Sequence, residues 1–420
     1  MSEERTVKGF WWHPDTPDER WFGVLEQKTR ANIRLTCHAE ANTFTPLAES
    51  SGVTIHGRNE QGTPVTLFVV SRTRKTISGG MTTLQLHPGY VLEGIHLADK
   101  DSFKALAVDF RLQHLYGWLG ITGFDPRVSA NASGKVTISY KRPDQTCHEV
   151  GADTKVEFGL LTKYVCSVQE RSIDEEATIS ISHEVGLTFS TCREMIAAFR
   201  SLLHFAILKP VYAVGMTFRG FAGQEQPDER PPHEVVVWSG NWHEPKTEYS
   251  AEPVWIFRYS DVATNFGTFF AKWLNYRLQY DEPLDCYTTT VYHPLPTPVE
   301  HLCLTQALDA YHGVRHASHA RRDFKAKVEE LCEQHQDALS WLVSDTSSFA
   351  TQVRDTRDYH THHNPKDLAT RDVVLGTTSL RRLNEKLAVL FQSCVLQDMG
   401  IPEERLRRLH RQMASDIVEY

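Results

Sequence analysis

Residues 293–298 read HPLPTP, and this short stretch separates two parts of the chain with different character. Every second residue is proline, which lacks the backbone N–H and fixes φ, so the stretch fits neither a helix interior nor a central strand. We therefore predict an extended connector here. Because 420 residues exceed what one compact core usually holds, we predict two regions, residues 1–293 and residues 299–420.

The region after the connector has the period of amphipathic helices, with apolar residues recurring at three- and four-residue spacing. Helix caps and the position of Pro402 mark the ends of several segments. The predicted helices cover 299–317, 323–342, a segment that starts after Asp345 and Thr346, a segment from about Thr378 to Gly400, and a segment that Pro402 opens. The expected structure of residues 299–420 is an all-α helical bundle.

The region before the connector alternates instead with period two, as half-buried strands do. Strand character is clearest at residues 32–36, 64–70 and 177–182, and helices are predicted at 193–208 and 262–278. Trp11, Trp12 and Trp21 are interpreted as core aromatics rather than as a ligand platform. The predicted fold class is α+β: a β-rich N-terminal region with a few helices, followed by the helical bundle.

The bulk composition excludes several classes of protein. No apolar run approaches the roughly 18 residues that span a bilayer, and the first residues lack the apolar core of a secretory signal, so a cytoplasmic protein without membrane contact is expected. The net charge of −8 gives no overall attraction to polyanions. A nucleic-acid site would therefore have to be a local groove.

Residues 356–365 read TRDYHTHHNP and place His360, His362 and His363 within four positions. Pro365 disfavours α geometry at Asn364, so the three histidines should lie in the last turn of a helix, where cations are favoured. The simplest explanation is a set of caps and solvated charges.

A metal site is the second possibility, because further histidines occur at helical spacing, at His312, His316 and His319. Helical ligand pairs usually stand at i and i+4, with the third ligand arriving from another segment. His360 and His363 stand at i and i+3, and no signature supplies a third ligand. We predict neither a metal nor another cofactor.

A third explanation comes from the arginine. Arg357 and His362 fit the pattern R-x-x-x-x-H. On an ideal helix these two side chains point about 140° apart, so they converge only if the helix ends between them. The sequence Asn364-Pro365 favours such an end.

The bundle with TRDYHTHH on its third helix resembles the HEPN superfamily of ribonucleases, whose signature is an arginine, four to six residues and a histidine. Residues 304–312, LTQALDAYH, are similar to the first helix of the ApeA-like HEPN domain. The segments VKGFWWHP (7–14), VTIHGR (53–58) and LYGWL (115–119) look like parts of the ApeA N-terminal domain. The resemblance covers nearly the whole chain and implies an anti-phage defence protein of the abortive-infection type, a toxin that cleaves RNA.

By this resemblance Arg357 and His362 are the catalytic residues. Imidazole titrates nearest neutral pH and suits proton transfer, whereas guanidinium matches phosphate oxygens and suits charge stabilisation. Asp309, Asp358, Tyr359, His360 and His363 are expected to support the site or position RNA. His363 also satisfies the allowed spacing, and Arg354 with His360 forms a competing pair. Asp358 could orient His362 or weaken phosphate affinity.

The implied activity is that of a metal-independent endoribonuclease that leaves 2′,3′-cyclic phosphate and 5′-OH ends, with tRNA as a candidate target. One arginine and one histidine make half a site, so a homodimer through the helical region is expected. Residues 1–293 are interpreted as a sensing or regulatory region, with a phage-encoded protein as a candidate trigger. The competing hypotheses are a non-catalytic HEPN scaffold and a metal-dependent hydrolase.

Overall fold

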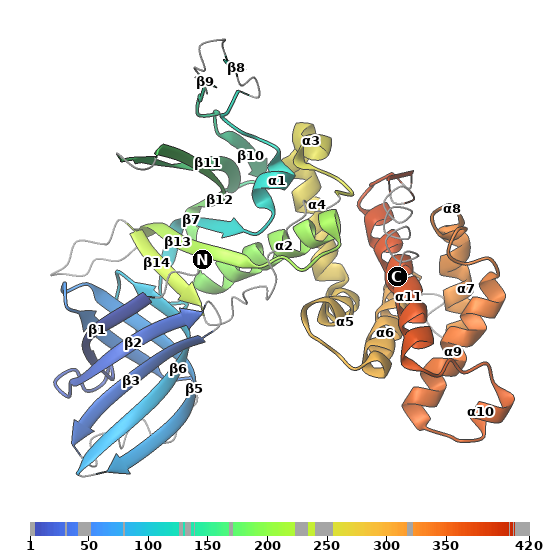
Figure 1. Cartoon of the computed structure of the whole chain (residues 1–420), viewed down its shortest axis with the longest axis horizontal. Coiled ribbons are helices and arrows are strands. Elements are labelled where there is room, and N and C mark those ends of the chain that lie inside the picture. The colour runs from blue at the N-terminus through green and yellow to red at the C-terminus, as the bar shows by residue number, and fades with distance from the viewer. Residues whose placement is uncertain are drawn as a thin grey trace. The chain divides into compact units, whose positions relative to one another are not determined.

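A computed structural model gives the fold of the chain (Figure 1). It describes residues 5–29, 32–40, 52–78, 80–125, 129–130, 136–137, 139–167, 171–222, 234–239, 255–316, 322–402, 404–405 and 407.

The chain forms two compact units. Unit 1 comprises Met1–Arg200 and Val211–Glu252, and unit 2 comprises Ser201–Pro210 and Pro253–Tyr420. The proline connector lies between two helices of unit 2, α5 (Asp281–Tyr292) and α6 (Thr297–Arg315). The division into domains at residues 1–293 and 299–420 remains a prediction. The two compact units divide upstream of the connector, after Glu252.

Six strands of unit 1 close into a barrel. They are β1 (Arg5–Trp12), β2 (Trp21–Thr29), β3 (Asn32–Glu40), β4 (Thr54–Asn59), β5 (Pro64–Ser78) and β6 (Met81–Glu93). Their antiparallel order is β6-β3-β2-β1-β4-β5, and β5 pairs back onto β6 (Figure 1). Alternate residues of each strand point inward, so the interior is apolar. The predicted core role of Trp11, Trp12 and Trp21 is confirmed, since all three are buried.

Gly57 on β4 permits the packing of the barrel core. A Cβ atom at this position would come within 2.3 Å of Cε3 in the Trp11 indole. Only glycine therefore lets the strand approach the ring so closely.

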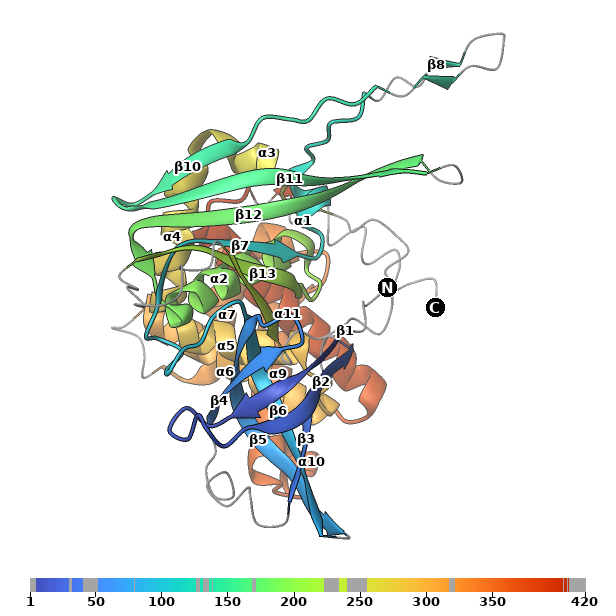
Figure 2. The ribbon, with the colours of Figure 1, turned by 90° about the vertical axis from the view of Figure 1, so that its left-hand side faces the viewer.

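Strand β6 also pairs with β14 (Glu234–Ser239), which continues the sheet away from the barrel. The order from there is β14-β13-β7-β12-β11-β10, as Figure 2 shows for most of these strands. Their bounds are β7 (Lys104–Leu112), β10 (Thr146–Val150), β11 (Thr154–Cys166), β12 (Arg171–Leu187) and β13 (Ala213–Ala222). The smaller elements of unit 1 are α1 (Leu115–Leu119), β8 (Ser129–Ala130) and β9 (Val136–Thr137).

One helix covers this second part of the sheet. On α2 (Phe189–Ile207), the ring of Phe199 lies 5.6 Å from that of Phe110 on β7 and 6.2 Å from that of Phe158 on β11. These contacts explain the dense apolar pattern that predicted a helix at 193–208. The three predicted strands are confirmed within β3, β5 and β12.

Unit 2 is helical, which confirms the predicted fold class. Besides α5 and α6 its elements are α3 (Tyr259–Val262), η1 (Ala263–Asn265), α4 (Phe266–Gln279), α7 (Phe324–Gln334), α8 (Gln336–Leu339), α9 (Thr346–His362), α10 (Asp367–Thr370) and α11 (Thr377–Asp398). Aromatic rings fill its core: Tyr287 of α5 stacks on Phe391 of α11, with ring centroids 4.8 Å apart. No helix in the described ranges combines the length and apolar character that a membrane span needs.

One of the predicted helices of unit 2 is divided in the structure. The predicted helix 323–342 is wrong as a single element, because it is divided into α7 and α8 at His335, which is itself almost fully buried. The predicted end at Gly400 is confirmed: α11 stops just before it, and Gly400 takes φ 82 and donates its N–H to the Gln397 carbonyl at 2.8 Å. The predicted helix after Pro402 falls mostly outside the described residues.

Candidate active site

Helix α9 carries the residues of the candidate site, and its sequence determines both of its ends. Asp345 is the N-cap, and its carboxylate accepts the N–H of Ser348 at 3.0 Å. At the other end His363 adopts the left-handed conformation, with φ 49, and donates its N–H to the Tyr359 carbonyl at 2.7 Å. Between these ends α9 packs against α6 and α7.

Two neighbours hold the guanidinium of Arg357. Its Nη2 donates to Oδ2 of Asp309 on α6 at 3.1 Å, and its Cζ lies 4.4 Å from the ring centroid of Phe324 on α7. The Arg357 side chain is still 27 % exposed. The group is therefore fixed in direction and yet open to solvent, which is what an arginine needs to meet a phosphate.

Asp309 serves a second cation as well. Its Oδ1 accepts from Nζ of Lys327 on α7 at 2.6 Å, and Lys327 is only 7 % exposed. One carboxylate between an arginine and a lysine leaves a local excess of one positive charge. The sequence interpretation gave Asp309 a supporting role, and the structure places it against Arg357.

The expected break in the helix between Arg357 and His362 is wrong. Helix α9 runs without interruption through His362, and the chain leaves it only at His363. The side chains of Arg357 and His362 therefore diverge by about 140° within one copy of the chain. The reason is that Pro365 acts through Asn364 and not further upstream, so the helix can continue to His362. His362 is exposed.

His360 lies on the same side of α9 as Arg357, since a spacing of three residues separates the two side chains by about 60°. Its ring centroid is 6.4 Å from that of His301 on α6. Burial lowers the pKa of His360, and the neighbouring His363 lowers it further. Among the described residues, no hydrogen-bond partner reaches the buried Nε2 of His360.

His301 forms the inner wall next to His360. It is fully buried, and its Nδ1 lies 2.9 Å from Oδ1 of Asn384 on α11. Burial lowers the pKa of His301 to about 4, and the nearby charges of His360 and Arg357 act in the same direction. His301 is therefore neutral at pH 7 and adds no charge beside Arg357.

The remaining candidates, Asp358, Tyr359 and His363, lie in the C-terminal part of α9 or just after it and differ in their contacts. Asp358 accepts from Arg371 at 2.7 Å, so its charge is paired with that arginine. Tyr359 is half-buried, and its ring centroid lies 5.2 Å from that of His360 and 5.8 Å from that of His363. His363 is exposed at the helix end. The structure thus gathers Tyr359, His360 and His363, and turns Asp358 toward Arg371.

The competing arginine, Arg354, is held by its neighbour in sequence. Its Nε and Nη2 donate to Oδ1 of Asp355 at 2.9 and 2.6 Å, and the Asp355 side chain is almost completely buried. This two-point contact ties Arg354 to the body of unit 2.

Sequence reasoning missed three residues that shape the site: Lys327, Phe324 and His301. Each of them follows the helical period of its own apolar face. Phe324, Lys327 and Leu331 follow one another at spacings of three and then four, and His301, Leu304 and Leu308 do the same. A lysine or histidine on such a face signals a buried partner, and this signal was available in the sequence.

Comparison with known families assigns both parts of the chain. The ApeA N-terminal domain 1 matches residues 6–273, and the Apea-like HEPN domain matches residues 302–405. No curated protein and no solved structure matches the chain. The second match contains Asp309 and the whole of α9.

The two matched domains follow one another in the order that the sequence resemblance predicted, and the first of them alone covers more than half of the chain. They point to a role in anti-phage defence and to the HEPN nuclease type for the helical part. The chain therefore belongs to the ApeA family, with an N-terminal ApeA domain followed by an ApeA-like HEPN domain.

Proposed function

We propose that this protein is a metal-independent endoribonuclease that acts in anti-phage defence, with Arg357 and His362 as its catalytic residues. The observation that carries the proposal is the position of the Arg357 guanidinium, which is held by two neighbours and still exposed. In a HEPN domain, a guanidinium held by Asp309 and Phe324 remains 27 % exposed, two turns or less from three histidines.

The reaction needs no group beyond those of the chain and the RNA. A base removes the proton of a ribose 2′-OH, the 2′-oxygen attacks the adjacent phosphorus, and the bond from phosphorus to the 5′-oxygen breaks. An acid returns a proton to the leaving 5′-oxygen. The products are a 2′,3′-cyclic phosphate and a 5′-OH, and DNA is not cleaved because it lacks the nucleophile.

In this proposal Arg357 binds the phosphate and stabilises the negative charge that gathers on its oxygens in the transition state. Lys327 keeps Asp309 in place, so that Asp309 orients Arg357 without neutralising the whole site. His362 moves the proton. The exposed position of His362 suits a group that must reach a substrate.

The continuous helix α9 makes a second copy of the chain part of this proposal. Arg357 and His362 diverge within one copy, and the 2′-OH and the leaving 5′-oxygen lie on opposite sides of the phosphorus, so the two proton transfers call for two groups. Two HEPN domains that face each other would supply two arginines and two histidines to one phosphate. We therefore propose a homodimer in which each copy contributes to a shared site.

The biological setting belongs to the proposal as well. We propose that the protein works in the cytoplasm of an infected cell as an abortive-infection toxin. Unit 1 would receive a phage-encoded trigger, and structured RNA such as tRNA would be the target. A non-catalytic HEPN scaffold is the alternative, and it predicts the same fold without any cleavage.

The test compares induced expression of the wild type with Arg357→Ala and His362→Ala, followed by sequencing of cellular RNA by its end chemistry. We expect RNA with 2′,3′-cyclic phosphate ends from the wild type, and a loss of at least about 100-fold in both variants. Arg381→Ala and His293→Ala are matched controls, because both residues are exposed and lie outside α9. Equal fragmentation by the wild type and Arg357→Ala would eliminate the nuclease.

Two further variants identify the histidine. His360→Ala and His363→Ala replace the two neighbours of His362 in the same turn region. If His362 is the acid or base, only His362→Ala abolishes cleavage, whereas His360→Ala weakens it by disturbing the packing beside Arg357. Retained cleavage in His362→Ala together with its loss in His363→Ala or His360→Ala would transfer the role to that residue.

A further inference from the structure

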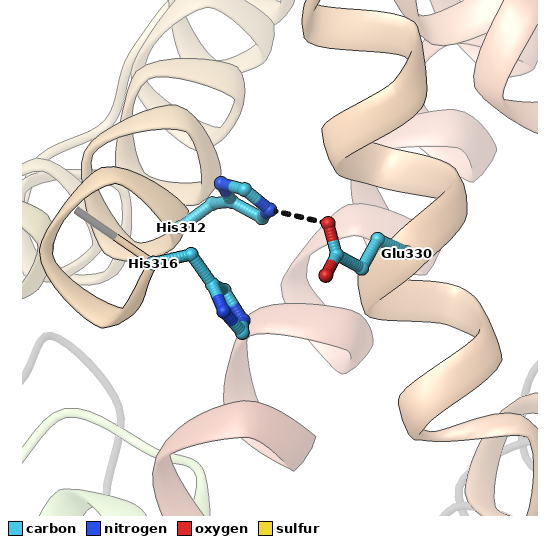
Figure 3. Close-up of side chains that lie close together, drawn as sticks. All are labelled: His312, His316 and Glu330. Atoms are coloured by element: carbon cyan, nitrogen blue, oxygen red, sulfur yellow. Dashed lines mark hydrogen bonds and ion pairs between the residues drawn. The ribbon is translucent and has the colours of Figure 1, made fainter. Parts of the chain in front are cut away.

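A second group of polar side chains lies between α6 and α7, apart from the residues proposed for cleavage (Figure 3). His312 lies in the last turn of α6, and His316, four residues further on, is the C-cap residue that follows Arg315; Glu330 faces them from α7. One ligand atom from each residue lies within 4.8 Å of the other two. Nε2 of His312 is 2.9 Å from Oε2 of Glu330.

We propose that His312, His316 and Glu330 bind a divalent transition-metal ion, with Zn²⁺ as the best match, which fastens α6 to α7. Two histidines at i and i+4 with a carboxylate from another helix form a recurrent zinc donor set. This is the arrangement that His360 and His363 lack, because they stand at i and i+3.

The distances fit the donor set with small adjustments. Zinc bonds of about 2.0–2.2 Å to nitrogen and oxygen place tetrahedral ligand atoms roughly 3.3 Å apart. The three ligand atoms, no more than 4.8 Å apart, reach this spacing by rotations of the side chains. Three protein ligands leave one position of the tetrahedron for water.

The surroundings also suit a metal ion. His312 is fully buried, and it turns its Nε2 toward Glu330, so this nitrogen is the atom that would bind the ion. Nε2 of Gln334 lies 3.4 Å from Nε2 of His316, and such outer contacts orient a ligand ring. The nearby Lys327 is paired with Asp309.

A contact of Arg322 with Glu330 competes with the ion for the carboxylate. Nη1 of Arg322 donates to the same Oε2 of Glu330 at 2.7 Å. The Arg322 side chain is 44 % exposed, so it can turn into solvent or stay as an outer partner of the carboxylate when the ion enters.

The consequence concerns the helix pair. The contacts Asp309 with Lys327, His312 with Glu330, and His316 with Gln334 each join residues 18 apart, so they advance together along α6 and α7. An ion bound at the second and third contacts would also fix the first, between Asp309 and Lys327. Asp309 is the residue that binds Arg357. The ion takes no part in the cleavage step.

The test uses the full chain, freed of metal with a chelator and then titrated with ZnCl₂. We expect about one tightly held zinc per chain after gel filtration and a zinc-dependent rise in melting temperature. His316→Ala and Glu330→Gln should weaken zinc binding by roughly tenfold or more. Co²⁺ in place of zinc should give the visible absorption of a four-coordinate site, which both variants lose.

Three control variants show whether a loss of zinc binding is specific to the proposed ligands. Glu329→Gln changes the adjacent carboxylate of α7, and His293→Ala removes an exposed histidine elsewhere, so both should bind zinc as the wild type does. Arg357→Ala should also keep the zinc-dependent rise, which separates this proposal from the nuclease. If Glu330→Gln unfolds, His316→Ala decides alone. Wild type without a zinc-dependent rise, or unchanged zinc binding in His316→Ala, would overturn the proposal.

Discussion

Asp309 is the residue whose charge organises the candidate site. Its two oxygens bind two different cations, Arg357 from α9 and Lys327 from α7. The two contacts differ in their surroundings, because Lys327 is nearly buried and Arg357 is partly exposed. Loss of the carboxylate should therefore have a structural effect through the lysine and a functional effect through the arginine.

We predict that Asp309→Asn lowers the free energy of unfolding by about 1.5–3 kcal/mol, because Lys327 keeps its charge and loses the negative charge that compensates for its burial. Chemical denaturation measures the change. Glu329→Gln is the matched control: its partner Lys325 lies on the same helix at the surface, so its loss should cost no more than about 0.5 kcal/mol.

A double variant separates the two effects of Asp309. Asp309→Asn combined with Lys327→Met removes both members of the buried pair and should regain most of the lost stability. RNA cleavage should stay impaired, because the neutral amide at position 309 holds the guanidinium of Arg357 more weakly than the carboxylate does. Full recovery of cleavage in the double variant would show that Asp309 acts through stability alone.

The residues of the site were accessible to sequence reasoning to different degrees. Arg357 and its histidines stand in a motif of fixed spacing, so the sequence alone identified them. Lys327 and His301 belong to the site through packing between helices, and the pairing of α6 with α7 and α11 is not contained in any local pattern. Periodicity shows that a face is buried and does not show which residues it meets.

Helix α9 determines the directions in which the side chains of the motif point. The sequence predicted that this helix starts after Asp345 and Thr346 and ends near Asn364, and α9 begins at Thr346 and ends two residues before Asn364. The expected break between Arg357 and His362 does not occur. The helix stays regular through His362, because proline restricts only its immediate predecessor. The division of the predicted helix 323–342 at His335 was not predictable either, because this buried residue is not a helix breaker.

The end of α9 contains a testable strain. His363 takes φ 49, and this left-handed conformation costs a residue with a Cβ about 1–2 kcal/mol. Glycine removes that cost and loses about 0.5–1 kcal/mol through its freedom in the unfolded chain. We therefore predict that His363→Gly raises the free energy of unfolding by about 0.5–1 kcal/mol, measured by urea denaturation.

The adjacent position provides the opposite control. His362 is helical, so His362→Gly should lower the free energy of unfolding by about 0.3–0.5 kcal/mol. His363→Gly should also keep RNA cleavage if His362 is the catalytic histidine. A destabilised His363→Gly would mean that α9 does not end where the structure places its end.

At the scale of the whole molecule, the helical body is larger than the region after the proline connector. The sequence predicted an extended connector between a β-rich region and a helical one, whereas the structure has helix α5 before the stretch and helix α6 from Thr297 onward. The sequence gave no sign that the helices before the connector pack on those after it. Tyr287 of α5 stacks on Phe391 of α11, and the hydroxyl of Tyr276 on α4 donates to Asp398 of α11 at 3.3 Å. Contacts between residues more than 100 positions apart leave no local trace in the sequence.

These contacts predict how fragments of the chain should behave. A fragment of residues 299–420 loses α4 and α5, and with them the Tyr287 ring on Phe391 and the Tyr276 hydroxyl on Asp398, whereas a fragment of residues 253–420 keeps both helices. Both fragments lack 201–210, so they differ only in the segment of interest. We expect the shorter fragment to melt on the order of 10 °C lower, or to show no cooperative transition, because it loses buried aromatic packing. Circular dichroism during heating measures the difference. Equal melting of the two fragments would place the structural boundary at the connector and make residues 299–420 an independent domain.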